Sequence, residues 1–249
     1  MISMEGKRVV VTGAGGGVGE ALVKCFAEAG ASVVGCDLDG VDLSALPIAE
    51  THRFDLSDRA ATLAAADAIL AGGAPDAVIS NAGLTRAETL DMTGPDEIEG
   101  EMALNYTGAA LLTRRLLPAM APGSAFVFIA SVNGIAHFGN PAYSAAKAAL
   151  IAWSRALATE AGARGIRSNA VAPGSIRTPG WDHRVARDPD LMERVSALYP
   201  MARVVTPQEV ANAVLFLASP MAGGITGVTL PVDAGLMGGN MPFIRLIEG

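Results

Sequence analysis

Short runs of β-branched residues alternate with longer stretches of helical composition along most of this chain. The runs are RVVVT at 8–12, ASVVGCD at 31–37, DAVIS at 76–80, SAFVFIA at 124–130, IRSNAVA at 166–172 and VTLPVD at 228–233. This alternation predicts βαβ units, in which helices cover both faces of a parallel sheet. The valine-rich first run predicts a central strand. We therefore expect an α/β protein with a Rossmann-like, doubly wound parallel sheet.

One domain is expected for the whole chain. Its 249 residues, of which 51% are hydrophobic, can bury a large core. No internal repeat, low-complexity tract or proline- and serine-rich linker divides residues 1–249. The segment at about 174–206 lacks a regular pattern, and a loop of that length inside a compact domain is usually functional.

Composition narrows the possible partners and the compartment. The formal charge of −7, with no block of basic residues, argues against nucleic acid as a partner. The chain has no apolar run of the roughly 18 residues that a membrane helix needs, and its first residues lack the apolar core of a signal peptide. Cys25 and Cys36 lie among apolar neighbours, as free cysteines of a reducing compartment do. We expect a cytoplasmic protein that acts on a small molecule.

Metal chemistry is not predicted. The three histidines are scattered along the chain and have no metal-ligand spacing to cysteines or acidic residues. They are His52, His137 and His183.

A glycine-rich loop follows the first predicted strand directly. The segment TGAGGGVGEAL at 12–22 has the spacing T-G-x-x-x-G-x-G, and it does not fit the pattern G-x-G-x-x-G. Glycines let a backbone turn tightly and approach a pyrophosphate, whose charge then lies against the N-terminus of the next helix. The loop therefore predicts a dinucleotide site.

Asp37 ends the second predicted strand, where an acid can accept hydrogen bonds from the adenosine ribose hydroxyls. A carboxylate there repels a 2′-phosphate. Neither the glycine loop nor Leu38 offers a basic partner for such a phosphate. NAD(H) is therefore predicted in preference to NADP(H).

The glycine loop and seven further segments resemble the short-chain dehydrogenases/reductases over essentially the full length of the chain. The matching segments are TGAGGGVG at 12–19, FDLSD around Asp55, SNAG at 80–83, LNYTG around Asn105 with IASVNG around Ser131, YSAAK at 143–147, PGSIRT at 173–178 and ITGVTLPVDAG at 225–235. In SNAG, Ser80 stands where the family has asparagine. The resemblance implies that the cofactor is bound by Thr12, Gly13, Gly17, Val18, Gly19, Asp37, Asp55, Leu56, Asn81, Ala82, Gly83, Tyr143, Lys147, Pro173, Gly174, Ile176 and Thr178.

The same resemblance implies a catalytic tetrad of Asn105, Ser131, Tyr143 and Lys147. Tyr143 and Lys147 are four residues apart in a predicted helix and share a face. A free tyrosine has a pKa of about 10, too high for acid/base work near neutrality, and a neighbouring positive charge lowers such a pKa by roughly 1–3 units. Lys147, an oxidised nicotinamide and the helix N-terminus would each supply positive potential. For the last of these, Asn140 is predicted as the N-cap and Pro141 as the first helical residue.

The remaining roles follow from hydride transfer between a secondary alcohol or ketone and the nicotinamide. Tyr143 takes or gives the proton, Ser131 holds the substrate oxygen, and Lys147 also contacts the nicotinamide ribose. By resemblance, Asn105 would support a water through which the proton reaches solvent. We expect substrate contacts from Ser131, Asn133, His137, Tyr143 and Trp181, beneath a lid at about 179–206.

Two other functions remain open from the sequence. One is a 3-oxoacyl-carrier-protein-type reductase, which the arginines of the variable segment keep possible although Asp37 and the net charge oppose it. The other is a non-catalytic, NAD-sensing protein, which would be expected to lose tetrad members. The resemblance also implies a homotetramer, with the helices around 96–118 and 141–161 at one interface.

Overall fold

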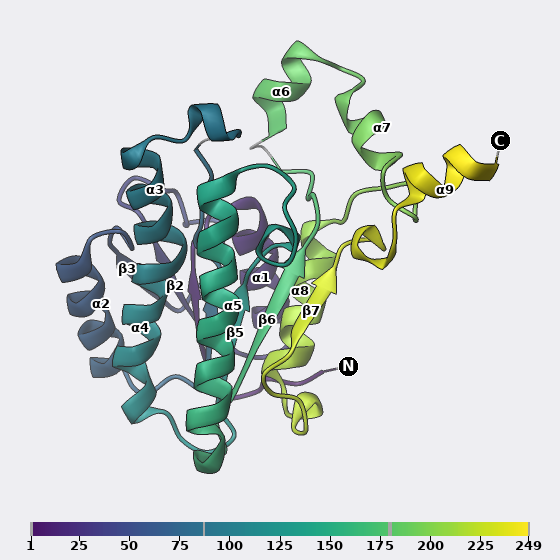
Figure 1. Ribbon diagram of the computed structural model, residues 1–249. Coiled ribbons are helices and arrows are strands. Elements are labelled where there is room, and N and C mark those ends of the chain that lie inside the picture. The colour runs from purple at the N-terminus through teal and green to yellow at the C-terminus, as the bar shows by residue number, and fades with distance from the viewer. Residues whose placement is uncertain (1, 87, 179–180, 249) are drawn as a thin grey trace.

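The computed structural model describes residues 2–86, 88–178 and 181–248, and its described part contains a parallel sheet in the order β3-β2-β1-β4-β5-β6-β7 (Figure 1). The strands are β1 (Arg8–Thr12), β2 (Ser32–Asp37), β3 (Glu50–Arg53), β4 (Ala77–Ser80), β5 (Ala125–Ile129), β6 (Arg167–Pro173) and β7 (Thr229–Val232). The helices are α1 (Gly17–Glu28), α2 (Arg59–Ala71), α3 (Pro95–Met102), α4 (Gly108–Leu116), α5 (Pro141–Ala161), α6 (Asp182–Arg187), α7 (Leu191–Ser196), α8 (Pro207–Ala218) and α9 (Met241–Glu248). The predicted fold class is confirmed.

Each strand that the β-branched runs predicted is present, and β1 is central because it pairs with both β2 and β4. The sequence did not predict β3. Its residues, ETHR, are polar and only half-buried, since β3 lies at the edge of the sheet and pairs with β2 alone. An edge strand that is partly exposed does not need an apolar run.

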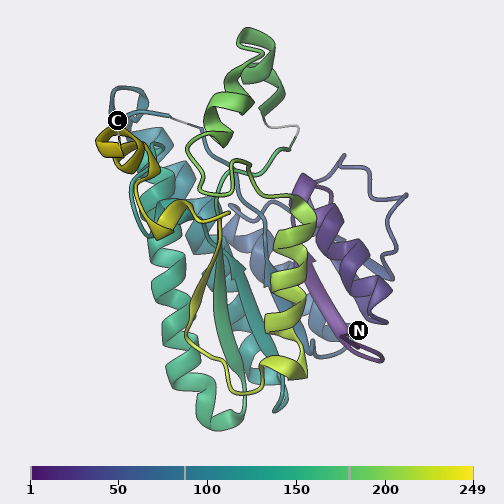
Figure 2. The same ribbon diagram turned by 90° about the vertical axis from the view of Figure 1, so that its right-hand side faces the viewer.

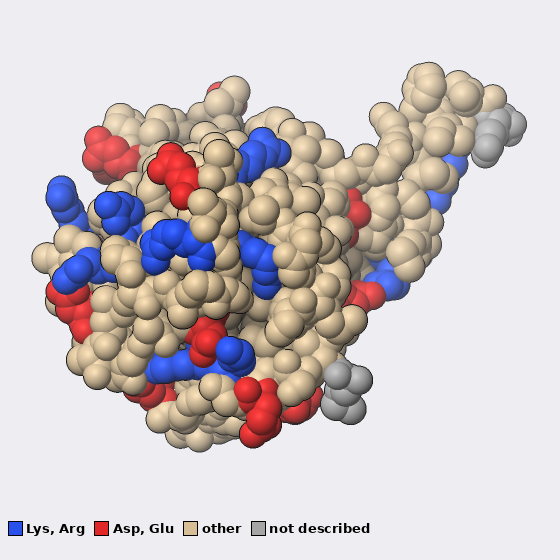
Figure 3. All heavy atoms as spheres, turned by 90° about the horizontal axis from the view of Figure 1, so that it is seen from below, with Lys and Arg blue, Asp and Glu red and all other residues tan. Residues whose placement is uncertain are grey.

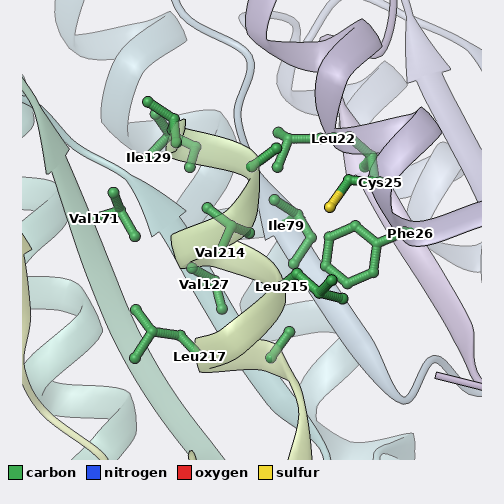
Figure 4. Close-up of a cluster of buried hydrophobic side chains, with 14 of the residues drawn as sticks. Leu22, Cys25, Phe26, Ile79, Val127, Ile129, Val171, Val214, Leu215 and Leu217 are labelled. Atoms are coloured by element: carbon green, nitrogen blue, oxygen red, sulfur yellow. The ribbon is translucent and has the colours of Figure 1, made fainter. Parts of the chain in front are cut away.

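Helices form a layer on each side of the sheet (Figures 1 and 2). On one side α1 packs against α8, and Phe26, Ile79 and Val214 belong to the core that fills the space between these helices and the sheet (Figure 4). On the other side α2 packs against α4, and α5 lies along β6. The sheet is therefore buried between two layers of helices. Because the strands are parallel, their carboxyl ends lie at one edge of the sheet.

The chain order reverses between β1 and β4, which are neighbours in the sheet although β2 and β3 separate them in sequence. At such a switch point the loops leave in opposite directions and open a crevice outside the carboxyl ends of the strands. A cleft of about 1590 Å³ lies there, lined from the β1 end at Thr12 to the β6 end at Pro173.

The segment at 174–206 is more regular than the sequence predicted, because it contains α6 and α7. Residues 179 and 180, where the expected lid begins, lie outside the described residues. Charges in and beside this segment are paired within the protein. The ion pairs are Arg177–Asp182, Arg184–Glu88, Arg194–Asp188 and Arg203–Glu209. Two helices of six residues each, without hydrophobic periodicity, are too short for the sequence pattern to have predicted them.

At the C-terminus, α9 extends away from the body of the protein (Figure 1). Phe243, Leu246 and Ile247 of this helix are 58%, 78% and 67% exposed. On the face seen from below, lysines and arginines are interspersed with acidic side chains (Figure 3). No helix within the described residues is long and apolar enough to span a bilayer.

Candidate active site

The glycine loop is locked to the turn after β4 by hydrogen bonds between side chains and backbone. The Thr12 hydroxyl accepts from the backbone N–H groups of Asn81 and Ala82, each at 3.0 Å. In return, Asn81 Nδ2 donates to the carbonyls of Thr12 and Gly13, also at 3.0 Å. Thr12 and Asn81 thus shape the floor of the cleft that they line.

Two glycines of the loop are required by close packing. Gly13 has φ +65°, and a Cβ there would lie 2.9 Å from Ala82 Cα. A Cβ on Gly19 would lie 1.9 Å from the Gly13 carbonyl oxygen. Gly19 is buried and does not line the cleft, so its part in the fingerprint is to bring α1 close to β1. Gly17 and Val18, in the first turn of α1, do face the cleft.

Asp37 borders the end of the cleft next to the glycine loop. Its Oδ2 accepts from the backbone N–H of Gly15 at 2.8 Å, and its Oδ1 accepts from that of Leu38 at 2.8 Å. The β2–β3 register sets Arg53 beside Asp37, which the sequence did not predict. Arg53 donates to the Leu38 carbonyl at 3.0 Å and is not among the residues that line the cleft.

The cofactor residues implied by the resemblance gather around this cleft. Those that line it are Thr12, Gly13, Gly17, Val18, Asp37, Asp55, Leu56, Asn81, Ala82, Gly83, Tyr143, Lys147, Pro173, Gly174, Ile176 and Thr178. The structure also brings in Ser175, whose N–H donates to the Tyr199 hydroxyl at 2.7 Å. Tyr199, which the sequence did not single out, thereby positions the PGSIRT segment against the cleft.

Ser131, Tyr143 and Lys147 meet at the other end of the cleft, at the carboxyl end of β5 and the first turns of α5. The Lys147 Nζ lies 5.4 Å from the Tyr143 ring centroid and donates to the Ile129 carbonyl at 2.9 Å. Lys147 is 3% exposed. The predicted helical face therefore does place the phenol and the ammonium together.

The electrostatics of this pair differ from the sequence prediction. Burial raises the pKa of Tyr143 to about 12, a hydrogen bond with Ser131 acts to lower it, and the charge of Glu101 raises it. Burial also lowers the pKa of Lys147 to about 8, while Glu101 acts to raise it. The expectation of a lowered tyrosine pKa is wrong for the protein alone, because loss of hydration disfavours the phenolate more than neighbouring dipoles favour it.

The start of α5 also differs in detail. Pro141 is the first helical residue and Asn140 is the N-cap, as predicted. Asn140, however, has φ 53°, and its Nδ2 donates to the Thr85 hydroxyl at 2.8 Å. The asparagine thus fastens the loop at 84–86 to the helix that holds the catalytic pair.

Asn105 lies behind the cleft, in a π-helical turn (Ala103–Thr107) between α3 and α4. It is 1% exposed, and its Nδ2 donates to Glu101 Oε2 at 2.7 Å and to the Leu84 carbonyl at 2.9 Å. Glu101 is itself 2% exposed. Sequence reasoning missed this glutamate, since an acid one turn from Asn105 gives no motif signal.

The substrate residues are placed unequally. Trp181 lines the cleft, with the Arg184 guanidinium 5.2 Å from its ring centroid. His137 does not line the cleft, whereas its neighbours Ala136 and Phe138 do, so the expected histidine contact is not supported. Asn133 lines the cleft, but its Nδ2 already donates to the Gly139 carbonyl at 2.8 Å and to Ser144 Oγ at 3.1 Å.

Known proteins resemble this chain in sequence and in fold. The model of the family described as enoyl-(acyl carrier protein) reductase matches residues 13–237. The chain belongs to the short-chain dehydrogenase/reductase family. An uncharacterised oxidoreductase of Schizosaccharomyces pombe is 40% identical over 98% of this chain and 96% of its own length. A 3-oxoacyl-(acyl-carrier-protein) reductase of Thermotoga maritima is 31% identical over 94% of this chain and 99% of its own length.

A solved structure of the same family, an oxidoreductase from Burkholderia thailandensis, superposes with a TM-score of 0.89 and is 37% identical over 97% of both chains. Members of the family are oxidoreductases that use a nicotinamide cofactor, so the chain is an oxidoreductase of this type. Among the described residues, no group of three or more histidine, cysteine or acidic side chains could hold a metal ion.

In this dehydrogenase/reductase, Tyr143→Phe should lower kcat by about 10²–10⁴-fold because it removes the proton-transferring oxygen. The Kd for NADH should stay within about threefold, since each tenfold change would need about 1.4 kcal/mol of cofactor contact. Steady-state kinetics and fluorescence titration measure both quantities. Tyr106→Phe, which removes the hydroxyl of a tyrosine whose ring packs on Trp153, is the matched control. A Tyr143→Phe enzyme that kept a tenth of its kcat would exclude the acid/base assignment.

Lys147→Met should stabilise the protein near pH 7 by about 2–3 kcal/mol, because the ammonium of Lys147 is buried and its pKa falls from 10.5 to about 8 on folding. The unfolded chain binds the extra proton between these values, so wild-type stability rises from pH 8 to 10.5 and the difference shrinks. Urea denaturation at pH 7 and pH 10 checks this. The control is Lys24→Met, at an exposed lysine of α1. A difference between variant and wild type that is the same at both pH values would contradict the interpretation.

Proposed function

We propose that this protein is an NAD-dependent oxidoreductase that interconverts a secondary alcohol and its ketone, with Tyr143 as the general acid/base. One observation supports this most directly. A single cleft has the glycine loop and Asp37 at one end, and Ser131, Tyr143 and Lys147 at the other.

The cleft suits a dinucleotide. It lies at the switch point of the sheet and faces the first turn of α1, and its lining includes Gly13, where a Cβ would lie 2.9 Å from Ala82 Cα. A helix N-terminus attracts the charge of a pyrophosphate. Thr12, Gly13, Gly17 and Val18 would hold this part of the cofactor, and Asp37 would accept the ribose hydroxyls.

The chain's own residues would carry out the proton chemistry. When bound, the nicotinamide supplies the hydride donor or acceptor and, in its oxidised form, a positive charge. Ser131 Oγ orients the substrate oxygen toward Tyr143. Tyr143 Oη accepts the hydroxyl proton during alcohol oxidation and returns it during ketone reduction. The Lys147 ammonium lies 5.4 Å from the ring centroid, and its positive charge would favour the phenolate. Burial alone disfavours the phenolate and raises the pKa of Tyr143.

The cofactor preference rests on Asp37. Its carboxylate borders the adenosine end of the cleft, where a 2′-phosphate would have to lie against it. Desolvating two facing negative charges costs several kcal/mol unless a cation pairs with them. Arg53 is the nearest cation by strand register, but its bond to the Leu38 carbonyl occupies it away from the cleft lining.

An uncharged substrate of small or medium size fits the other end. Arg184 lines the cleft there but is paired with Glu88, and the Arg86 charge acts on the buried Glu101. A substrate anion would have to compete with Glu88 for the Arg184 guanidinium. Apolar contact is offered by Phe138, Trp181 and Leu198, which favours a neutral alcohol beneath α6 and α7.

The main alternative is a 3-oxoacyl-carrier-protein-type reductase, which the Thermotoga maritima relative favours. That function would require a surface that receives an acidic carrier. Three arginines of the segment above the cleft are already paired with acidic side chains, which argues against a carrier-protein surface. The pairs are Arg177–Asp182, Arg194–Asp188 and Arg203–Glu209.

A panel of secondary alcohols assayed with NAD⁺ and NADP⁺ tests the proposed function. We expect turnover with neutral secondary alcohols, and kcat/KM about 100-fold or more higher with NAD⁺, equivalent to about 2.7 kcal/mol. Asp37→Asn should lower the ratio of kcat/KM with NAD⁺ to kcat/KM with NADP⁺ by at least about tenfold, because the carboxylate no longer repels the 2′-phosphate. The absorbance of the NADH or NADPH formed reports these rates.

Asp39→Asn, at an exposed acid two residues further on, is the matched control for Asp37. Arg53→Ala shows whether that arginine serves the 2′-phosphate. Equal kcat/KM values for NAD⁺ and NADP⁺ in the wild type would refute the cofactor assignment. Turnover restricted to acyl-carrier substrates would favour the alternative function, and cofactor binding without any turnover would favour a sensor.

We also propose a homotetramer, located in a reducing compartment such as the cytoplasm. The outer face of α5 presents Ala145, Ala148 and Ala152, whose small side chains permit close approach of a second copy. The two cysteines are free and buried.

Light scattering should give the mass of four chains, and Ala152→Arg should reduce it. Ala71→Arg, on an exposed turn of α2, is the control. A wild-type monomer at micromolar concentration would disprove the tetramer.

A further inference from the structure

Glu101 is a buried carboxylate that the proposed reaction does not use. It lies near the end of α3, one helical turn before Asn105, and is 2% exposed. A buried acid needs hydrogen-bond donors or positive charge to offset the loss of hydration. The groups that donate hydrogen bonds to Glu101 belong to or adjoin the catalytic residues, which indicates that it positions them.

Both carboxylate oxygens of Glu101 are hydrogen-bonded. Oε1 accepts from the backbone N–H of Arg86 at 2.5 Å, and Oε2 accepts from Asn105 Nδ2 at 2.7 Å. The side chain of Thr85 donates to it as well. Thr85 also accepts from Asn140, the N-cap of α5, so Glu101 connects three elements around the tetrad.

These bonds fix the orientation of the Asn105 amide. An ionised carboxylate only accepts, so it selects the NH₂ end of the asparagine and would repel the oxygen. With Nδ2 held by Glu101 and by the Leu84 carbonyl, the amide oxygen points the other way and accepts from Leu84 N–H at 3.3 Å. The same oxygen and Lys147 Nζ both border Gly83, at 2.7 Å and 3.1 Å from where its Cβ would be.

We propose that Glu101 is a positioning residue of the active site, whose carboxylate holds the Asn105 amide with its oxygen toward Lys147. An acceptor on that side can hold a water or the ammonium itself, whereas the flipped amide would present two N–H groups to a cation. This inference rests on the proposed function, because the orientation matters for catalysis only if Lys147 and Tyr143 move a proton.

Charge adds a second consequence. The groups that face Glu101 are Thr85 and Arg86 from the loop after β4, Asn105 from the π-helical turn, and Tyr143 and Lys147 from α5. Burial raises the pKa of Glu101, and Arg86 opposes this shift. In turn, the charge of Glu101 raises the pKa values of both Tyr143 and Lys147.

Glu101→Gln removes the charge and leaves the shape. The pKa values of Tyr143 and Lys147 should both fall, so the pH at half-maximal kcat for alcohol oxidation should move down by about half a unit to one unit. We expect kcat at neutral pH to fall about tenfold through the misplaced amide, with the KM for the alcohol within about twofold, a split typical of effects on the reaction step. Glu99→Gln, at an exposed acid of the same helix, is the matched control.

A measurement without turnover separates the inference from the proposed function. In ¹⁵N–¹H spectra, the Nδ2 protons of Asn105, assigned by their loss in Asn105→Asp, should resonate downfield in the wild type because of the charge-assisted bond. Glu101→Gln should move them upfield, and Glu99→Gln should not. Glu101→Asp, which keeps the charge but is one methylene shorter, serves as a second variant and should lose the downfield position while retaining more of the pH profile.

An Asn105 resonance that is unchanged in both Glu101 variants would overturn the inference, whatever the enzyme's activity. A changed resonance with an unchanged pH profile and kcat would also overturn it, because Glu101 would then act on folding alone. If the wild type oxidised no alcohol while the resonance moved as expected, the proposed function would fail and the placement of Asn105 by Glu101 would stand.

Discussion

The site depends on the junction between the carboxyl ends of β1 and β4. These strands are neighbours in the sheet, and beyond them the chain continues as the glycine loop on one side and the 80–83 turn on the other. Four hydrogen bonds between Thr12, Gly13, Asn81 and Ala82 close the two segments on each other. Because Gly13 adopts a positive φ and a Cβ there would lie 2.9 Å from Ala82 Cα, no larger residue could complete this junction without displacing it. The dinucleotide end of the cleft is therefore a consequence of strand order.

Burial sets the chemistry at the other end. Lys147 is enclosed between β5 and α5, with its Nζ on the Ile129 carbonyl, and the free energy of hydration that it loses lowers its pKa to about 8. The same enclosure raises the pKa of Tyr143 to about 12. Neither shift makes the protein alone a good base. Additional positive charge next to the phenol would be needed, and this requirement couples proton transfer to occupation of the cleft by an oxidised nicotinamide. Catalytic competence would then depend on cofactor binding, in keeping with the proposed function.

Several details were beyond prediction from the sequence because they depend on contacts between distant segments. The strand β3 lacks an apolar run, since it lies at an edge. The helices α6 and α7 make contacts with distant parts of the chain, such as the Arg184–Glu88 ion pair between residues nearly a hundred positions apart. Near Ser131, local sequence could not tell that Phe138 rather than His137 would face the cleft. Glu101 belongs to the site through the packing of α3 against α5, which no spacing rule encodes.

By itself, the sequence determined the fold class, the central position of β1, the place of the glycine loop and the shared helical face of Tyr143 and Lys147. These features follow from local periodicity and from the special backbone freedom of glycine, both of which are properties of neighbouring residues. Tertiary structure alone decided the pKa values of the catalytic pair, the approach of Arg53 to Asp37 and the link from Glu101 to Asn105. Burial and through-space charge set these properties, and both depend on which residues the completed fold brings together and shields from water.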